Sequence, residues 1–309
     1  MGLERMRPGL GTYVSVHAEA LPDAPPGALE TALEAGFSAI QTVHEAMSFY
    51  SSLSDLARLR GAPPGTPVQV SPHTWAVLAL ALELAEASQG LFDPSIAPQL
   101  VLSGALPPPT QALPPDPTGS WQDIRLLPDH HVCCTRSLWL DLGGIAKGYA
   151  VDLALAALHA RGMVAATVNA GGDLACFGAC PLLLQIRPPA QPNTPQPLGW
   201  LQNGAAATSG DAFFGRPQAP AHAPVVHPRT GLRPPSPRSI TVLAPRCALA
   251  DGITKILALC PPGPPPAWLD ALLLKYAAHA AVLDEHANLR ASPGFWQALG
   301  HPATPVAPA

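Results

Sequence analysis

Apolar residues recur at helical spacing along several stretches of the chain. Between Gly27 and Ser48 they return every three or four positions, which predicts an amphipathic helix. Ser71 is the predicted N-cap of a second helix, because a proline follows it and Gly90 comes later as a stop signal. The helices predicted in this way span Gly27–Ser48, Ser71–Ser88, Ile145–Arg161, Ala248–Leu259 and Leu269–Tyr276.

Shorter apolar runs, bounded by glycine, proline and polar turn residues, predict strands. Because many of these runs follow one another directly, the order favours an α+β fold over a doubly wound sheet. No linker between independent domains is visible, so residues 1–309 are predicted to form a single large domain. The predicted strands span Thr12–Ala18, Trp121–Leu127, His131–Asp141, Val164–Asn169, Asp173–Gly178, Leu182–Arg187, Ala205–Thr208, Ser239–Ala244 and His279–Asp284.

The composition excludes several classes of protein. Hydrophobic residues make up 48% of the chain and charged residues 12%, which supports a sizeable core. The net charge is -4 and no basic run occurs, so we expect no nucleic-acid partner. No apolar run reaches about 18 residues, so we expect no membrane span.

The termini and the cysteines bear on location. The first residues carry no apolar signal core, which predicts a cytoplasmic protein; with a truncated N-terminus the prediction would be periplasmic. Six cysteines form no CxxC pair, and reduced thiols are the simplest interpretation. The 40 prolines predict stiff loops near 105–119, 188–198, 217–237 and 261–266, although a biased genome composition would explain them equally well.

Candidate chemistry begins with the stretch LDLGGIAKGYAVD, Leu140–Asp152. Gly143 and Gly144 precede a predicted helix, and Lys147 follows one turn later, which suits a phosphate or metal-phosphate group. The alternative is a turn whose glycines only permit close packing. The stretch contains neither GxGxxG nor GxxxxGK[ST], so it does not indicate a dinucleotide-binding turn or a P-loop.

A second stretch, CALADGITKILAL, places Asp251 and Thr254 three residues apart on one helical face. A carboxylate with a hydroxyl is a set of hard oxygens that suits Mg²⁺. Alternatively, Asp251 caps the helix and Thr254 bonds back to a carbonyl. Elsewhere, Tyr50 could stack on a planar ring, and Asp93 opens a turn with Pro94; each also has a purely structural interpretation.

Taken in order, eight short motifs resemble the FAD:protein FMN transferase family, also called ApbE. They are GT at Gly11–Thr12, MSFYSSLSDLARL, GLFDPSIAP, DLGGIAKGYAVD, VNAGGDL, ATSGD, HPRTG and LADGITK, and they extend to Leu259. The resemblance implies an α+β, T-fold-related domain with an antiparallel sheet and flanking helices. It also implies Mg²⁺-dependent transfer of FMN from FAD to a threonine or serine of an acceptor protein, one with an FMN-binding-type domain, releasing AMP.

The resemblance further implies roles for individual residues. Tyr50 would contact the isoalloxazine and Val226 would lie against the flavin. Asp251 would serve both catalysis and the metal, and His227 would take a catalytic role. The FAD-binding residues would be Tyr50, Leu91, Phe92, Asp93, Asp141, Lys147 and Val226. The Mg²⁺ ligands would be the carbonyl of Gly144 with Asp251 and Thr254.

This sequence also departs from the family pattern. Leu10 replaces a methionine, and Thr254 stands three rather than four residues after Asp251, so that Lys255 takes the fourth position. Pro224 replaces the family histidine and His227 its aspartate, so His227 or nearby His222 would have to activate the acceptor hydroxyl. Two alternatives follow: an FAD-binding protein that has lost transfer, and an FAD pyrophosphatase that yields FMN and AMP.

Overall fold

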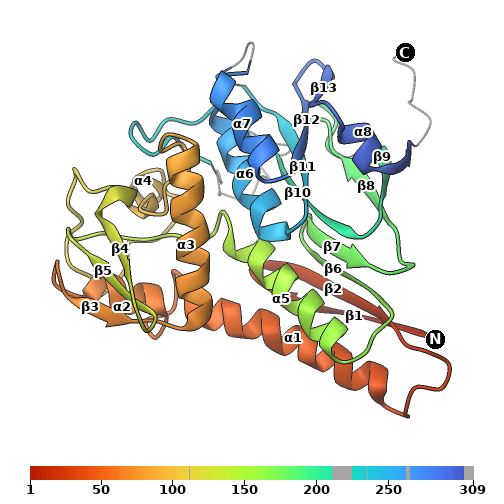
Figure 1. Ribbon diagram of the computed structural model, residues 1–309. Coiled ribbons are helices and arrows are strands. Elements are labelled where there is room, and N and C mark those ends of the chain that lie inside the picture. Colours follow the sequence, from red (N-terminus) through yellow and green to blue (C-terminus); the bar gives the residue numbers. More distant parts are fainter. Residues whose placement is uncertain (111, 211–224, 235, 262–264, 303–309) are drawn as a thin grey trace.

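A large antiparallel sheet forms the centre of the protein (Figure 1). The computed structural model describes residues 1–110, 112–210, 225–234, 236–261 and 265–302. Within them, the strand order is β1-β2-β6-β7-β10-β11-β12-β13, and each neighbouring pair is antiparallel. These strands are β1 Gly2–Gly9, β2 Thr12–Glu19, β6 Ala165–Ala170, β7 Asp173–Phe177, β10 Gly204–Gly210, β11 Ser239–Ala244, β12 His279–Leu283 and β13 Leu289–Ala291.

Three helices cover one face of this sheet. Helix α1 (Ala28–Met47) packs on β1 and β2 and contacts α5 (Ala146–Ala160), which lies on β6 and β7. Helix α6 (Cys247–Leu259) packs on β10 and β11 and also contacts α5. The contact between α5 and α6 brings two motifs about a hundred residues apart into one layer. Helix α7 (Ala267–Lys275) follows α6 in the chain.

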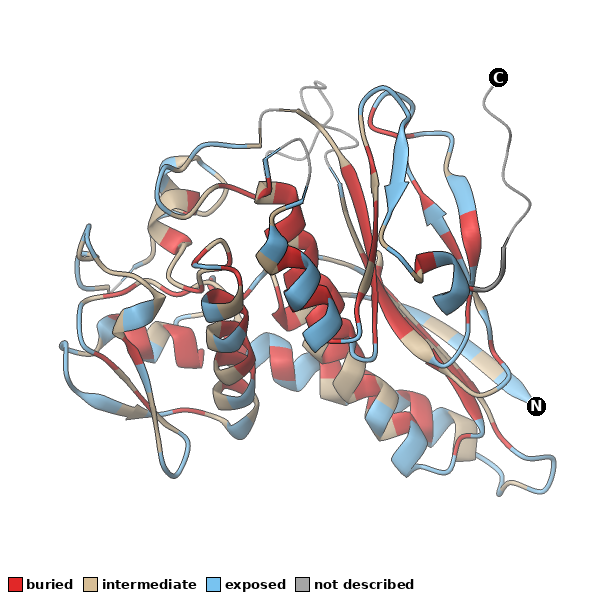
Figure 2. Ribbon diagram, turned by 45° about the horizontal axis from the view of Figure 1, so that its top comes forward, coloured by how far each residue is buried: buried red, intermediate tan, exposed pale blue. Residues whose placement is uncertain are grey.

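The opposite face of the sheet is covered by a smaller layer, which makes a second core. Its sheet has the order β14-β9-β8, and the helix α8 (Phe295–Ala298) lies beside it. The strands are β8 Leu182–Ile186, β9 Gln196–Leu201 and β14 Gly300–Pro302. Phe295 is fully buried there with Leu184 and Leu243. Because both its faces are covered, all six residues of β11 are buried, whereas the residues of β2 alternate (Figure 2).

A third group of elements lies beside the main sheet. Its small sheet has the order β3-β5-β4, and α3 makes a long helix next to it (Figure 1). Ser71 caps α3 as predicted, because its hydroxyl accepts a hydrogen bond from Thr74 N at 3.0 Å. These elements are α2 Asp55–Gly61, β3 Pro67–Gln69, α3 Pro72–Ala87, α4 Ala97–Leu102, η1 Trp121–Asp123, β4 Ile124–Leu127 and β5 His131–Cys134.

The α+β class, the antiparallel sheet and the flanking helices are confirmed, and all five predicted helices are present within one or two residues. Two predicted strands are wrong in part. Of Trp121–Leu127, the first three residues form the 3₁₀ helix η1 and only Ile124–Leu127 is a strand. His131–Asp141 ends as a strand at Cys134, and the chain then turns so that Asp141 N donates to Pro94 O at 2.9 Å. Strand β9 begins at Gln196, inside a range expected to be loop. None of the helices among the described residues combines the length and apolarity that a membrane crossing requires.

Candidate functional site

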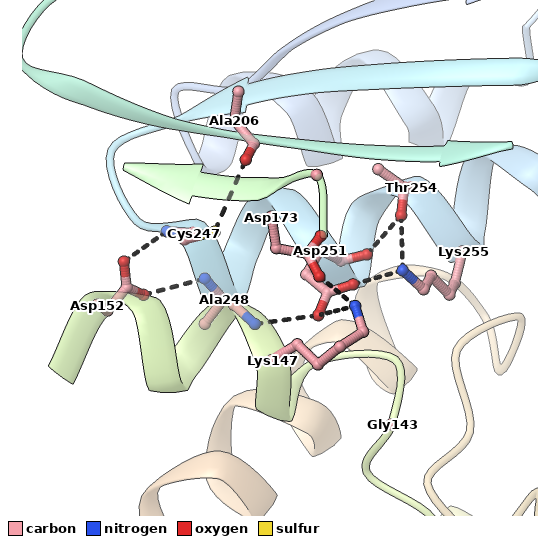
Figure 3. Close-up of polar contacts among 12 residues, drawn as sticks. Gly143, Lys147, Asp152, Asp173, Ala206, Cys247, Ala248, Asp251, Thr254 and Lys255 are labelled. Carbon is pink, nitrogen blue, oxygen red and sulfur yellow. Dashed lines mark hydrogen bonds and ion pairs between the residues drawn. The ribbon is translucent and has the colours of Figure 1, made fainter. Parts of the chain in front are cut away.

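The site is organised by the close contact between α5 and α6 (Figure 3). A Cβ added to Gly148 would lie 2.4 Å from Cys247 O, so only glycine allows the two helices to approach this closely. The carboxylate of Asp152 accepts hydrogen bonds from Cys247 N at 2.7 Å and from Ala248 N at 2.9 Å. Asp152 therefore satisfies the exposed amides at the start of α6 and holds that end on α5.

Four charged side chains meet where the two helices touch. Lys147 pairs with Asp173, and its Nζ lies 3.8 Å from Asp251 Oδ2. Lys255 Nζ donates to Asp251 Oδ1 and also to Thr254 Oγ1, the latter at 3.1 Å. Gly148 N donates to the second oxygen of Asp251 at 3.2 Å. The carboxylate of Asp251 thus lies between two ammonium groups; we call Lys147, Asp173, Asp251 and Lys255 the charge cluster.

Burial makes the members of the charge cluster depend on one another. Asp251 and Thr254 are fully buried, and Asp173 nearly so. Burial works against the charged form of Lys147, but Asp251 and Asp173 outweigh it and raise the pKa of this ammonium. Burial also opposes ionisation of Asp251, yet Lys147 and Lys255 together lower its pKa. Burial and the nearby charge of Asp251 raise the pKa of Asp173.

A small pocket opens beside the charge cluster, with Lys255 in its wall. The enclosed volume is about 60 Å³, below the roughly 300 Å³ at which ligand pockets usually begin, so it can hold part of a ligand as it stands. Its lining joins four separate segments of the chain. They contribute Leu91, Phe92, Asp93, Ile96, Leu100, Asp141, Gly144, Val225, Val226, Pro228, Lys255 and Leu259.

Two carboxyl groups line this pocket. Asp141 accepts a hydrogen bond from Gly143 N at 3.1 Å, and burial raises the pKa of its carboxyl to about 6. Asp93 accepts hydrogen bonds from the amide and the hydroxyl of Ser95, at 2.8 and 2.7 Å, while burial raises its pKa. Asp93 therefore shapes its turn as well as the pocket wall. Asp141 is the better placed of the two to accept a hydrogen bond from a ligand.

Most of the predicted FAD-binding residues come together, but two do not. Leu91, Phe92, Asp93, Asp141 and Val226 all line the pocket, as does Gly144. Tyr50 is 66% exposed in the loop after α1 and is not part of the lining; its ring contacts Phe49. Lys147 lies in the charge cluster and is not among the lining residues.

His227 lies in the turn that follows Val226, and its ring is engaged within that turn. Arg229 N donates to His227 Nδ1 at 3.2 Å, which favours the neutral tautomer with its proton on Nε2. In that form the free nitrogen is a donor, so the ring does not present a base to an acceptor hydroxyl. His222, the other residue named for this role, lies outside the described residues, as does Pro224, which replaces the family histidine.

The predicted Mg²⁺ ligands do not fit a dication in this arrangement. Thr254 Oγ1 donates to Asp251 O at 2.7 Å, which is the back-bonded alternative predicted from the sequence. Both oxygens that would face a metal, Asp251 Oδ1 and Thr254 Oγ1, accept from Lys255 instead. A Mg²⁺ ion in their place would meet the ammonium groups of two lysines, which repel it. Gly144, whose carbonyl was the third predicted ligand, lines the pocket.

Sequence reasoning assigned no role to three residues that the structure places at the site. Asp173 pairs with Lys147, Asp152 holds the start of α6, and Lys255 joins the charge cluster to the pocket. Asp173 had a visible signal, since it stands between two apolar runs. Lys255 was noted only as a departure from the family pattern, at the fourth position after Asp251.

The fold and the site together define a class: a mixed α+β protein with a partly buried pocket lined by apolar side chains, two carboxyl groups and Lys255. The chain belongs to the ApbE family, whose model matches residues 10–278. A relative from Vibrio cholerae named FAD:protein FMN transferase is 26% identical over 230 residues, covering 69% of each chain. Another of that name from Haemophilus influenzae is 27% identical over 238 residues, 70% of this chain and 68% of the relative.

Solved structures agree on the fold. The flavinyl transferase ApbE of Pseudomonas stutzeri, in its apo form, superposes with a TM-score of 0.78 at 22% identity, covering 97% of this chain and 98% of that one. The ApbE protein of Thermotoga maritima gives 0.79 at 23% identity, covering 97% of this chain and all of that one, 100%. At such identities the likeness shows a common fold, and the roles of single residues have to be argued from this chain.

Proposed function

We propose that this protein transfers FMN from FAD to a threonine or serine hydroxyl of an acceptor protein and releases AMP. The named relatives and the family membership support the reaction class. The observation that carries the proposal is the joining of distant motifs: one pocket is lined by Leu91, Phe92, Asp93, Asp141, Gly144 and Val226, with Lys255 in its wall. An apolar surface with an ammonium at one edge suits a ligand that has both a flat ring and phosphates.

The reaction is a substitution at phosphorus. The acceptor hydroxyl oxygen bonds to the FMN phosphorus, the bond from that phosphorus to the bridging oxygen breaks, and AMP leaves with that oxygen. The hydroxyl proton is released. Such reactions depend mainly on positioning and on stabilising charge, which the pocket wall and the ammonium of Lys255 supply.

Mg²⁺ belongs to the same prediction, but the oxygens of Asp251 and Thr254 do not fit it here, so no step is assigned to a metal. His227, the residue predicted to act on the acceptor hydroxyl, also presents no base to it, because its free nitrogen holds a donor. That observation favours one second candidate, an FAD-binding protein that has lost transfer. A cytoplasmic location stays a prediction.

Mass spectrometry of an acceptor protein tests these candidates. The full chain is incubated with FAD and a protein that has an FMN-binding-type domain, alongside an acceptor in which the target threonine is changed to valine. We expect a mass gain of one FMN on the first acceptor, none on the second, and an equal amount of AMP. FAD binding without AMP would leave the second candidate, and AMP with free FMN would indicate a pyrophosphatase.

A further inference from the structure

Lysine is scarce in this chain, and its distribution is unusual. The three lysines are Lys147, Lys255 and Lys275, and the first two belong to the charge cluster. Lys275 is exposed at the end of α7. Since lysine is usually a surface residue, two of three at one largely buried site indicate that the site uses their charge.

The position of Lys255 is held by its surroundings. Its side chain is 17% exposed, and its ammonium bridges Asp251 Oδ1 and Thr254 Oγ1 (Figure 3). A Cβ added to Gly144 would lie 3.3 Å from Lys255 Cγ, so the glycine leaves room for the lysine stem along the pocket wall. An ammonium group has three donors, and these two contacts leave one for a ligand in the pocket.

Charge balance favours an ammonium over a dication at this point. The two carboxylates of the charge cluster, Asp173 and Asp251, are matched by the two lysines, so the cluster is neutral. Adding Mg²⁺ would leave two uncompensated positive charges in a buried region, which costs free energy. An ammonium already in place can instead act on a phosphate as a point charge.

We infer that the ammonium group of Lys255 takes the place of a divalent cation beside Asp251, so that the protein binds the phosphates of FAD without Mg²⁺. The inference rests on the proposed function for the identity of the ligand. Lys255 would contact a phosphate oxygen directly, while Asp251 and Thr254 keep the ammonium at the pocket wall. Lys147 and Asp173 would be positioning residues, because they neutralise and orient Asp251.

Two measurements on the unaltered protein test the inference. Quenching of flavin fluorescence gives the dissociation constant of FAD in excess EDTA and in excess Mg²⁺, and we expect the two values to agree within about twofold. A tenfold or larger gain in affinity with Mg²⁺ would overturn the inference. If FAD does not bind in either buffer, the proposed function fails, and the metal titration described next still decides whether Lys255 excludes a cation.

The metal titration uses Mn²⁺, whose free ion is counted by electron paramagnetic resonance, and needs no FAD. Lys255→Thr removes the ammonium and adds a hydroxyl, so it should bind one more Mn²⁺ than the unaltered protein. Its FAD affinity should fall at least about tenfold in EDTA and recover with Mg²⁺. Lys275→Thr, a matched lysine on the surface, should change neither quantity. Equal Mn²⁺ binding by Lys255→Thr and the unaltered protein, both folded by circular dichroism, would contradict the inference.

Discussion

Two carboxylates in this protein each lie between two cationic side chains, but in opposite surroundings. The Glu34 carboxylate on α1 accepts hydrogen bonds from the guanidinium groups of Arg5 at 2.8 Å and Arg7 at 2.9 Å. All three side chains are between 37% and 51% exposed. Asp251 on α6 forms ion pairs with Lys147 and Lys255, and its side chain is fully buried. If Glu34 loses its partners, water can solvate its carboxylate. If Asp251 loses its partners, no water reaches its buried carboxylate.

The difference teaches which charges are bound to a function. An exposed ion pair is screened by salt and contributes little to stability. Loss of the ion pairs of Glu34 should therefore change the free energy of unfolding very little. A buried group of charges is often no more stabilising than apolar residues of the same size. The stability that it provides is therefore not enough to explain the charge cluster.

Removing Asp251 should have the largest effect. Asp251→Ala leaves two ammonium groups near each other without their shared carboxylate, and we expect the free energy of unfolding to fall by about 3 kcal/mol. Urea denaturation measures the change, and FAD binding should be lost with it. The exposed Asp23 is a control, and Asp23→Ala should leave the denaturation midpoint unchanged. A similar midpoint for both variants would show that Asp251 is not held as described.

Adding a methyl group where α5 touches α6 should cause the second largest loss of stability. Gly148→Ala places a methyl group against Cys247 O, and we expect a loss of about 2 kcal/mol as α5 moves away from α6. Gly36→Ala on α1 is the matched control, because its added Cβ would meet Leu158 at an ordinary 3.6 Å. Thermal unfolding of both variants checks the prediction. Equal melting temperatures would contradict the close contact at Gly148.

Removing Lys147 should cost about as much near neutral pH, and this loss should shrink as the pH falls. Lys147→Met leaves Asp173 unpaired, which we expect to cost about 2 kcal/mol near neutral pH. The pKa of Asp173 is already raised and would rise further, so the folded variant binds a proton that the unfolded chain does not. The free energy of unfolding of the variant should therefore increase as the pH falls. The difference in this free energy between the variant and the unaltered protein should become smaller. Urea denaturation at about pH 8 and about pH 5 measures this difference. The same difference at both pH values would show that Asp173 is not the group that binds the proton.

The exposed ion pairs of Glu34 should show the smallest effect. Glu34→Gln removes the carboxylate between Arg5 and Arg7, yet we expect no measurable change in melting temperature at physiological salt. The Arg7 side chain also rests on the ring of Phe37, at 4.4 Å, and keeps that contact in the variant. A loss of stability as large as that of Asp251→Ala would show that exposed and buried ion pairs do not differ here as described.

Local patterns were enough to locate most elements of the fold. Helical spacing placed α1 and α6, and the proline after Ser71 marked the start of α3. Strand β1 was missed because its sequence, GLERMRPG, is polar and charged. It lies at an edge of the main sheet with every second residue exposed, so pairing with β2 decides its conformation rather than its own composition.

By itself, the sequence determined the class of fold, the motifs and half of the residues that line the pocket, because spacing and residue type are local properties. Tertiary structure alone decided how charges are paired. Lys255 meets Asp251 on the same helix, but Lys147 reaches Asp173 and Asp251 only because Gly148 lets α5 approach α6. Burial then sets the cost of each unpaired charge, and a sequence does not record which groups share a buried space.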